Sequence, residues 1–515
     1  MNERIPKRAK QILFMVAICI APLIGTFLLL LLTRFGSGIT QDSLAYVSMT
    51  RNLRQGEGIV ADTVTGETEL QTHYPPGVSL ALSIIPFLDP KDGFVFLNAA
   101  VFFGFLLCIG LLAFRLTKSL PLTIAIQSLG IILPGVFRIF SMMWSEPLFL
   151  FLLVAGMLAT VVAVQKQRKR GLLVAAGIWG YAMIVRYVGI VFLPFLLFVL
   201  WVGFTLPIKE KLKFSAMISA IVGLPIVVWY GIARIFGATE SVREFGFTLI
   251  PFEKLTEGAT TFFSWILPAP FVDIISSISV HVFFWGIVAT LFAGFILYQR
   301  EHVKIKEVLR FWIPLTFSLF YVAVVFFSIL FLDSSTPLDF RLLSPISVML
   351  LLGIMLAMQM LKDSRFYVKW AILAYFFVVF AWQTFPAIAE IYRDGLPYAT
   401  AGWRHSSTVA YVRHSIPGNA VVYTHAPQAL NVLSGKRVRA MPQKYSVGGT
   451  LVKEYVTNIS RLRMNEEDQY LVFFSHDFAL KARFATENEV LSILSLQKEF
   501  SSDEGAVYRI FPSAK

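Results

Sequence analysis

The sequence predicts a membrane protein built mainly from α-helices, followed by a small α/β domain. Three observations support this fold class. Of the 515 residues, 56% are hydrophobic and only 15% are charged, whereas soluble domains carry roughly 25% charged residues. The apolar residues form separate runs near the ~20 residues that cross ~30 Å of hydrocarbon as a helix. After the last run, the composition changes to alternating apolar and polar residues with turn signals between them.

The apolar runs predict about eleven transmembrane helices. They cover residues 12–33, 94–114, 121–137, 145–164, 171–185, 187–206, 214–233, 279–298, 311–332, 342–361 and 367–387. The first run is long enough to span and lacks the small-residue cleavage site of a signal peptide, so we expect it to remain as a helix.

Lysine and arginine residues predict the orientation of these helices, because such residues gather in cytoplasmic loops. They cluster in alternate connections: Arg4, Lys7, Arg8 and Lys10; Arg115 and Lys118; Lys166, Arg168, Lys169 and Arg170; Lys209, Lys211 and Lys213; Arg300, Lys304, Lys306 and Arg310; and Lys362, Arg365 and Lys369. We therefore expect a multi-pass protein of the cell (plasma or inner) membrane. Its N-terminus would be cytoplasmic, and its other loops and C-terminal domain extracytoplasmic.

The chain divides into a transmembrane domain, residues 1–388, and an extracytoplasmic α/β domain, residues 389–515. In the second part, VAYVRHSIPGNAVVYTH and DQYLVFFSH are typical of short strands, and ENEVLSILSLQKEF predicts a helix. In the first part, PFEKLTEGATTFFSWILPAP, in the loop from about residue 237 to 277, is typical of an amphipathic helix at the membrane interface.

Several functional classes are disfavoured. A net charge of +13 could suggest nucleic acid, but the basic residues lie between apolar runs as topology signals, so no nucleic-acid partner is expected. Cys19 and Cys108 both lie inside apolar runs and form no metal-ligand pattern. Asp333 and Asp339 share a loop, but Pro337 between them and their spacing disfavour a cation site. We expect neither a metal nor another cofactor.

The first extracytoplasmic loop, from residue 34 to about 93, holds the main candidate for chemistry. If residues 42–54 form a short helix at the membrane surface, Asp42 shares one stripe with Tyr46 and Leu53, facing protein, while Arg51 projects elsewhere. A carboxylate in a partly desolvated site can act as a general base. The alternative is that Asp42 only caps the helix. Tyr46 and Arg51 are expected to contact substrate.

The sequence HYPPG in the same loop predicts a second membrane-surface helix, because a double proline stops one helix and can open the next. His73 and Tyr74 would then lie at the membrane surface, where they could meet a phosphate head group or a sugar. The alternative for Tyr74 is an interfacial aromatic anchor.

Charged residues near the extracytoplasmic ends of the spans are further candidates. Glu146, at the mouth of the fourth span, could bind sugar hydroxyls or orient an acceptor, or only complement the helix dipole. Arg138, Arg186 and Arg341 carry planar guanidinium groups suited to phosphate oxygens and could hold an anionic lipid head. Each of these arginines taken alone could equally be a snorkelling or salt-bridged residue.

Short motifs stand at the ends of several predicted spans and in the C-terminal part. They are QDSLAY, HYPPG, WSEPLFLFLL, RYVGIVFLP and DFRLLSPISVMLLL, with TVAYVRHSIPGNAVVYTHAPQALNVLSGKRV in the C-terminal part. With these motifs the layout resembles the GT-C superfamily of polyprenyl-phosphate-dependent glycosyltransferases, in particular the bacterial members similar to protein O-mannosyltransferases and to the aminoarabinose transferase that modifies lipid A.

The resemblance implies an inverting transfer of a sugar from a polyprenyl-phosphate donor to an acceptor hydroxyl on a glycan, lipid or protein. It assigns the catalytic base to the position of Asp42. Two features depart from relatives in the superfamily: Ser43 replaces the second acid common in protein mannosyltransferases, and no Asp-x-Asp metal motif of the oligosaccharyltransferase kind is present. A transporter or flippase of a lipid-linked or anionic substrate, and a non-catalytic polysaccharide-binding protein, remain alternatives. The scarcity of charges in the middle of the spans disfavours the transporter.

Overall fold

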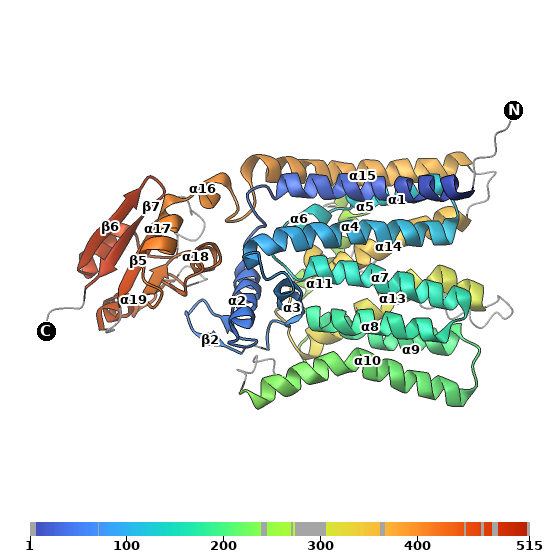
Figure 1. Cartoon of the computed structure of the whole chain (residues 1–515), viewed down its shortest axis with the longest axis horizontal. Helices are drawn as coiled ribbons and strands as arrows, with labels where there is room; N and C mark the ends of the chain where they lie inside the picture. Colours follow the sequence, from blue (N-terminus) through green and yellow to red (C-terminus); the bar gives the residue numbers. More distant parts are fainter. Residues whose placement is uncertain are drawn as a thin grey trace.

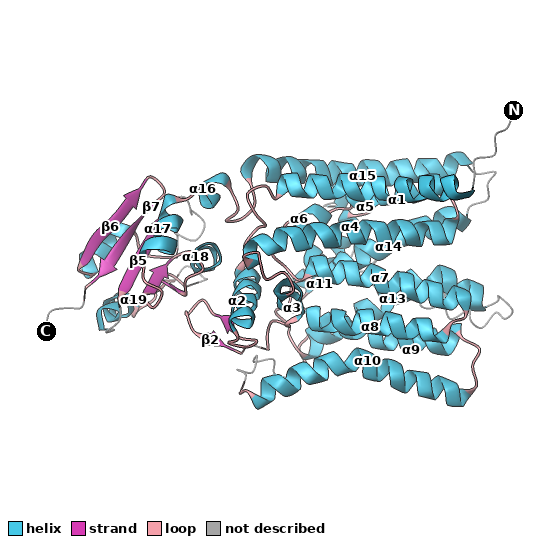
Figure 2. Ribbon diagram, viewed as in Figure 1, coloured by secondary structure: helices cyan, strands magenta, loops and turns pink. Residues whose placement is uncertain are grey.

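The computed structural model describes residues 7–70, 72–237, 245–268, 271–272, 305–360, 366–446, 450–464, 468–475 and 483–511. Within them, long helices lie side by side in a bundle, and a β-sheet with its own helices lies beyond one end of that bundle (Figures 1 and 2). Shorter helices and a small hairpin cover the end of the bundle that faces the sheet. The chain is therefore mainly helical, with a mixed α/β C-terminal part.

The bundle helices correspond to ten of the predicted spans. They are α1 (Lys7–Leu32), α4 (Pro90–Thr117), α5 (Leu120–Ile131), α7 (Glu146–Lys166), α8 (Lys169–Val185), η1 (Tyr187–Val191) with α9 (Phe192–Gly203), α10 (Ile208–Ile235), α13 (Ile305–Phe331), α14 (Phe340–Met360) and α15 (Phe366–Asp394). Six of them, α1, α4, α7, α10, α13 and α15, contain a stretch long and apolar enough to cross a membrane. The protein is thus an integral membrane protein, and the total of eleven spans stays a prediction because residues 279–298 lie outside the described part.

The predicted span at 121–137 is wrong at its C-terminal end. Helix α5 stops at Ile131, and a 12-residue helix covers only about 18 Å. The cause is local, because Pro134 disfavours helical backbone at the residue before it and Gly135 has a left-handed φ of 78°. A short helix, α6 (Val136–Phe140), follows this break.

Two of the basic connections, between α7 and α8 and between α9 and α10, lie at the bundle end opposite the sheet (Figure 1). The α7–α8 and α9–α10 links touch there, since Gln167 Nε2 donates to the carbonyl of Gly203 at 3.1 Å and Lys169 pairs with Glu210. This arrangement agrees with the alternation of basic loops in the sequence. Which end faces the cytoplasm stays a prediction.

The first long loop folds as predicted into short helices. They are α2 (Gln41–Gln55) and α3 (Gly77–Ser83), with a small antiparallel hairpin between them, β1 (Ala61–Asp62) and β2 (Thr68–Glu69). Thr40 is the N-cap of α2, and its backbone N–H donates to Ser43 Oγ at 2.9 Å. Asp42 therefore lies in the first turn and is not the capping residue. The later loop contains α11 (Phe252–Ser264), in the segment predicted to form a helix.

In its described residues, the C-terminal part forms a five-stranded sheet with short helices. Its elements are α16 (Ala401–Arg404), α17 (Ser407–Ser415), β3 (Val421–Thr424), α18 (Pro427–Ser434), β4 (Val438–Ala440), α19 (Tyr455–Ser460), η3 (Arg461–Met464), β5 (Gln469–Phe474), α21 (Glu487–Ile493), β6 (Leu496–Ser502) and β7 (Gly505–Ile510). The strand order is β4-β3-β5-β7-β6; β3 pairs in parallel with β4 and β5, and the other pairs are antiparallel.

One secondary-structure prediction in this part is wrong, and another is confirmed only in its first half. VAYVRH forms helix α17 instead of a strand, because Ser406 Oγ accepts from the N–H of Val409 and the buried Val409, Val412 and Ile416 recur at helical spacing. The predicted helix in ENEVLSILSLQKEF ends at Ile493, and Leu496 begins β6 because this stretch pairs with β7. The strand in DQYLVFFSH is confirmed as β5.

The sheet has a separate core on each face. Val422 and Val472 belong to the apolar core that continues into the bundle, whereas Leu471 and Tyr508 pack with residues such as Val490 in a second core. The boundary at 388/389 stays a prediction, since α15 continues without interruption to Asp394.

Close packing of α8 against α10 makes a test of the bundle. A Cβ on Gly180 would lie 2.6 Å from the carbonyl oxygen of Ile221, whereas one on Gly177, a turn earlier in α8, would meet nothing within 4 Å. We expect Gly180→Ala to lower the free energy of unfolding by about 1–3 kcal/mol. Gly177→Ala should be neutral or stabilising by up to about 1 kcal/mol. Thermal unfolding of the two variants in detergent measures the difference, and equal stability would contradict this packing.

Candidate active site

The candidate site forms where the segments before α2 and α7 pair with each other. The N–H of Gly38 donates to the carbonyl of Ser141, and the N–H of Met143 donates to the carbonyl of Gly38, both at 2.9 Å. A Cβ on Gly38 would lie 2.3 Å from Met142 Sδ, so glycine permits this close approach. As a result, the first turns of α2 and α7 lie next to each other.

Side chains reinforce this junction. Trp144 Nε1 donates to Thr40 Oγ1 at 2.9 Å, and Ser43 Oγ donates to the carbonyl of Met143 at 3.1 Å. Both bonds join the N-terminal turn of α2 to the residues immediately before α7. They hold Asp42, which lies between Thr40 and Ser43, and Glu146, which follows Trp144 by two residues, on adjoining helices.

Arg341, in the first turn of α14, connects the two carboxylates. Its Nη2 lies 2.6 Å from Asp42 Oδ2 and 2.8 Å from Glu146 Oε1, and its Nε donates to Glu146 Oε1 at 2.9 Å. The guanidinium also lies over the ring of Trp144, 3.8 Å from its centroid. Asp339 fixes the start of α14, since its Oδ1 accepts from the N–H groups of Arg341 and Leu342 at 3.0 Å.

Glu146 also forms an ion pair with Arg186, from the junction of α8 and η1. The Glu146 side chain is only 2% exposed, so it requires these two positive partners. Asp42 differs, because its side chain is 29% exposed and pairs with Arg341 through one oxygen. The cluster thus contains a buried carboxylate that holds two arginines and an accessible carboxylate beside them.

Two tyrosines border the cluster. Tyr46, buried on α2, lies edge-on to Tyr74 with 5.7 Å between ring centroids, and His73 packs on Tyr74 at 4.7 Å. Burial, and then the charge of Asp42, raise the pKa of both Tyr46 and Tyr74 above the usual value. Both hydroxyls are therefore protonated at neutral pH and can donate hydrogen bonds, but neither is a base.

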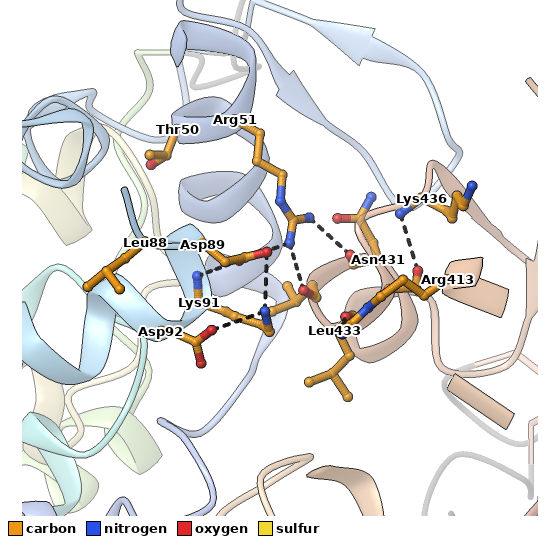
Figure 3. Close-up of polar contacts among 12 residues, drawn as sticks. Thr50, Arg51, Leu88, Asp89, Lys91, Asp92, Arg413, Asn431, Leu433 and Lys436 are labelled. Carbon is orange, nitrogen blue, oxygen red and sulfur yellow. Dashed lines mark hydrogen bonds and ion pairs between the residues drawn. The ribbon is translucent and has the colours of Figure 1, made fainter. Parts of the chain in front are cut away.

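The structure brings together some predicted site residues and separates others. Asp42, Glu146, Arg186 and Arg341 form the cluster, and Arg138 lies near it, exposed, with its guanidinium 5.5 Å from the centre of the Phe340 ring. Arg51 lies elsewhere. Its guanidinium is directed toward α18 in the C-terminal part (Figure 3).

Sequence reasoning did not identify Trp144 or Tyr321 as part of this region. Trp144 stands in the WSEP motif two residues before Glu146, which is a signal that could have found it. Tyr321 is buried on α13 and donates to the carbonyl of Leu342 at 2.6 Å, a contact that no local pattern predicts. Asp339, considered only as a metal ligand, is instead the residue that caps α14.

A metal has no evident ligand set in the described part of the chain. Within these ranges no group of three or more His, Cys, Asp or Glu side chains is placed to hold an ion. The positive charge at the site comes from guanidinium groups, which bind phosphate or carboxylate oxygens through paired N–H donors.

The burial of Glu146 makes a stability test. Glu146→Gln would leave Arg186 and Arg341 without their shared counter-charge in a buried site, so the free energy of unfolding should fall by about 3 kcal/mol. The matched control is Glu57→Gln, which removes an exposed pair with Arg437 and should cost less than about 1 kcal/mol. Thermal unfolding in detergent compares them. Equal losses in the two variants would show that Glu146 does not hold the cluster.

Comparison with known proteins identifies the fold. No protein-family model matches the sequence, and a search of curated proteins finds no match. Among solved structures, the chain is similar to ArnT from Cupriavidus metallidurans bound to undecaprenyl phosphate, at 13% identity and a TM-score of 0.55 over 99% of each chain. It is also similar to the Archaeoglobus fulgidus oligosaccharyltransferase AglB in complex with an inhibitory peptide and a dolichol-phosphate, at 12% identity and a TM-score of 0.51 over 97% of this chain and 74% of that one. Both are members of the GT-C superfamily, and this chain has their fold.

Proposed function

We propose that this protein is an inverting glycosyltransferase that moves a sugar from a polyprenyl-phosphate donor to an acceptor hydroxyl at the extracytoplasmic face of the membrane. The observation that carries the proposal is the cluster of Asp42, Glu146, Arg186 and Arg341 at one end of a bundle with the GT-C fold. An accessible carboxylate beside two guanidinium groups provides a base and a phosphate site in one place.

Asp42 is the proposed base. It accepts the proton of the acceptor hydroxyl as the hydroxyl oxygen attacks the anomeric carbon, which requires a carboxylate within hydrogen-bond reach of that oxygen. Its partial exposure, 29% of the side chain, leaves room for an acceptor to approach. In this structure Asp42 forms an ion pair with Arg341. An incoming phosphate would therefore compete with Asp42 for the Arg341 guanidinium.

Arg341 and Arg186 are the proposed phosphate ligands. The bond from the anomeric carbon to the phosphate oxygen breaks during transfer, and negative charge develops on the departing lipid phosphate. Fixed guanidinium donors stabilise such charge without further reorganisation. Glu146 pairs with both arginines and Trp144 stacks on Arg341. The two guanidinium groups are therefore held in place before the polyprenyl-phosphate sugar binds.

The arrangement favours inversion of the anomeric carbon. A retaining transfer through a covalent intermediate would need a second carboxylate that reaches this carbon. Glu146 is the nearest candidate in the cluster, but it is 2% exposed and its Oε1 accepts from both arginines. With Asp42 as the single accessible carboxylate of the cluster, a direct displacement is the simplest reaction.

The polyprenyl-phosphate donor is supported by the fold and by the membrane. ArnT of Cupriavidus metallidurans binds undecaprenyl phosphate and AglB binds a dolichol-phosphate in the matching structures. The proposed partners are accordingly a polyprenyl-phosphate sugar, membrane lipids, and a glycan, lipid or protein acceptor. The direct experiment is to incubate purified protein with a panel of radiolabelled polyprenyl-phosphate sugars and membrane extract, and to identify the labelled product. Absence of transfer from every donor, together with movement of a donor across vesicles, would favour a flippase.

Asp42→Asn should abolish most of the transfer, because the amide cannot accept the proton. We expect the rate to fall at least about 100-fold with the protein still folded and membrane-inserted. The control is Asp394→Asn, which removes an exposed carboxylate paired with its neighbour Arg393 and should leave the rate unchanged. Full transfer by Asp42→Asn would exclude Asp42 as the base.

Arg341→Gln should weaken donor binding and slow transfer. Loss of a charged donor to phosphate should raise the KM for the polyprenyl-phosphate sugar about tenfold or more. Arg341→Lys should recover only part of this loss, because one ammonium cannot reproduce the planar fork that contacts both carboxylates. Arg393→Gln is the control for loss of an arginine charge. An unchanged donor KM and kcat in Arg341→Gln would remove Arg341 from the phosphate site.

A further inference from the structure

The last turns of α2 carry two arginines that bind the C-terminal ends of two other helices. Arg54 Nη2 donates to the carbonyls of Leu82 and Ile85 at 2.6 and 2.7 Å, at the end of α3. Arg51 donates from Nη1 to the carbonyl of Asn431 at 3.1 Å and from Nη2 to that of Val432 at 2.8 Å, in the last turn of α18 (Figure 3). One end of α2 is therefore joined both to its own loop and to the C-terminal part of the chain.

The end of α18 is suited to this contact. The last carbonyls of a helix carry the negative end of its dipole, so they favour cations. The carbonyl of Asn431 also accepts from the N–H of Gly435 at 2.9 Å, and its second lone pair is available to Arg51. Gly435 ends α18 with a φ of 79°, and Arg413, from the C-terminal part itself, binds the next carbonyl, that of Leu433. Arg51, 380 residues before Asn431 in the sequence, binds the carbonyls of Asn431 and Val432 in the same turn.

The surroundings of Arg51 favour a lasting contact. Its side chain is 16% exposed, and Asp89 Oδ1 lies 3.4 Å from Nη2 as a counter-charge. Two further bonds join the same surfaces: Asn431 Nδ2 donates to Asp62 Oδ2 at 3.0 Å, and the N–H of Ala440 donates to the carbonyl of Val64 at 2.7 Å. In contrast, the nearby pair of Arg437 and Glu57 is exposed, at 60% and 42% of the side chains, and adds little.

Helix α2 connects this contact to the candidate site. Arg51 and Asp42 are nine residues apart on one helix, which is about 13 Å along its axis. Helix α2 is short and continuous. A shift of its C-terminal end therefore changes the position of Asp42 at its N-terminal end. An error of about 1 Å in the position of a catalytic group can cost on the order of 100-fold in rate.

We propose that Arg51 is a positioning residue through which the C-terminal sheet region holds α2, and with it Asp42, in register with the arginine cluster. The proposal rests on the proposed role of Asp42 as the base. It assigns to the C-terminal part a role in catalysis without contact with the reacting atoms. This role differs from the predicted contact of Arg51 with substrate, since its guanidinium binds α18 and Asp89.

The test compares Arg51→Ala with Arg437→Ala in the full-length protein. Three quantities are measured: hydrogen exchange of the α2 amides, affinity for undecaprenyl phosphate, and sugar transfer from the active donor of the panel to membrane extract. In Arg51→Ala, exchange in residues 41–55 should rise, the affinity should stay within about twofold of wild type, and kcat should fall about tenfold or more. Arg437→Ala should match wild type in all three measurements.

Several results would overturn the proposal. A large loss of undecaprenyl phosphate affinity with unchanged exchange in α2 would make Arg51 a phosphate ligand. Faster exchange confined to residues 427–434 would limit its role to stabilising α18. Unchanged exchange and kcat would remove any positioning role. The exchange measurement does not depend on the chemistry. Full transfer by Asp42→Asn would therefore exclude Asp42 as the base, while the contact of Arg51 with α18 would still be decided by the exchange of the α2 amides.

Two other variants keep the test decisive if Arg51→Ala folds poorly. Arg51→Lys keeps the charge, but its single ammonium cannot reproduce the fork that reaches two carbonyls and Asp89, so it should show the same changes to a smaller degree. Asp62→Ala removes the bond to Asn431 from the other side of the interface and should also increase exchange in α2. Wild-type exchange in α2 and wild-type kcat in both variants would contradict the proposal.

Discussion

The burial of the Glu146 carboxylate is the constraint on which the site depends. A carboxylate removed from water is strongly unfavourable unless opposite charges and hydrogen bonds surround it. Arg186 and Arg341 supply both, and in doing so they bring the ends of α7, α8 and α14 to one point. Arg341 has an N–H group that also reaches Asp42, which adds α2 to the same cluster. The positions of four helices are thus linked by a few charged groups in an otherwise apolar protein.

Arginine has the same physical role at both ends of α2. At the N-terminal end, Arg341 contacts two carboxylates and stacks on Trp144, and at the C-terminal end Arg51 binds two carbonyls of α18. A planar guanidinium has several donors in fixed directions, so one side chain can join three partners. The short helix that carries Asp42 is therefore held between the bundle and the sheet, so the C-terminal part contacts the helix that carries the proposed base.

Much of the fold could be predicted because the signals are local. Apolar runs determine the bundle helices, the double proline before Gly77 determines the start of α3, and the spacing around Asp42 predicts α2. The errors have equally definite causes. Pro134 and Gly135 ended α5 within an apolar run, and pairing with β7 made a strand of Leu496–Ser502 where a helix was predicted. Within the candidate site, Asp42, Glu146, Arg186 and Arg341 were predicted individually from residue type and position relative to the membrane, without any indication that they touch.

The sequence by itself determined that this is a membrane protein with a polar, arginine-rich region beside its first loop, because hydropathy and residue type are properties of short segments. Only the tertiary structure decided which charges meet. Asp42 and Arg341 are 299 residues apart, and Arg51 and Asn431 are 380 apart, so no periodicity relates them. Both pairings follow from packing of the helices, which brings their ends within hydrogen-bond distance. Arg51 shows the difference most clearly: from the sequence it is expected to contact substrate, and in the fold its guanidinium binds the carbonyls at the end of α18.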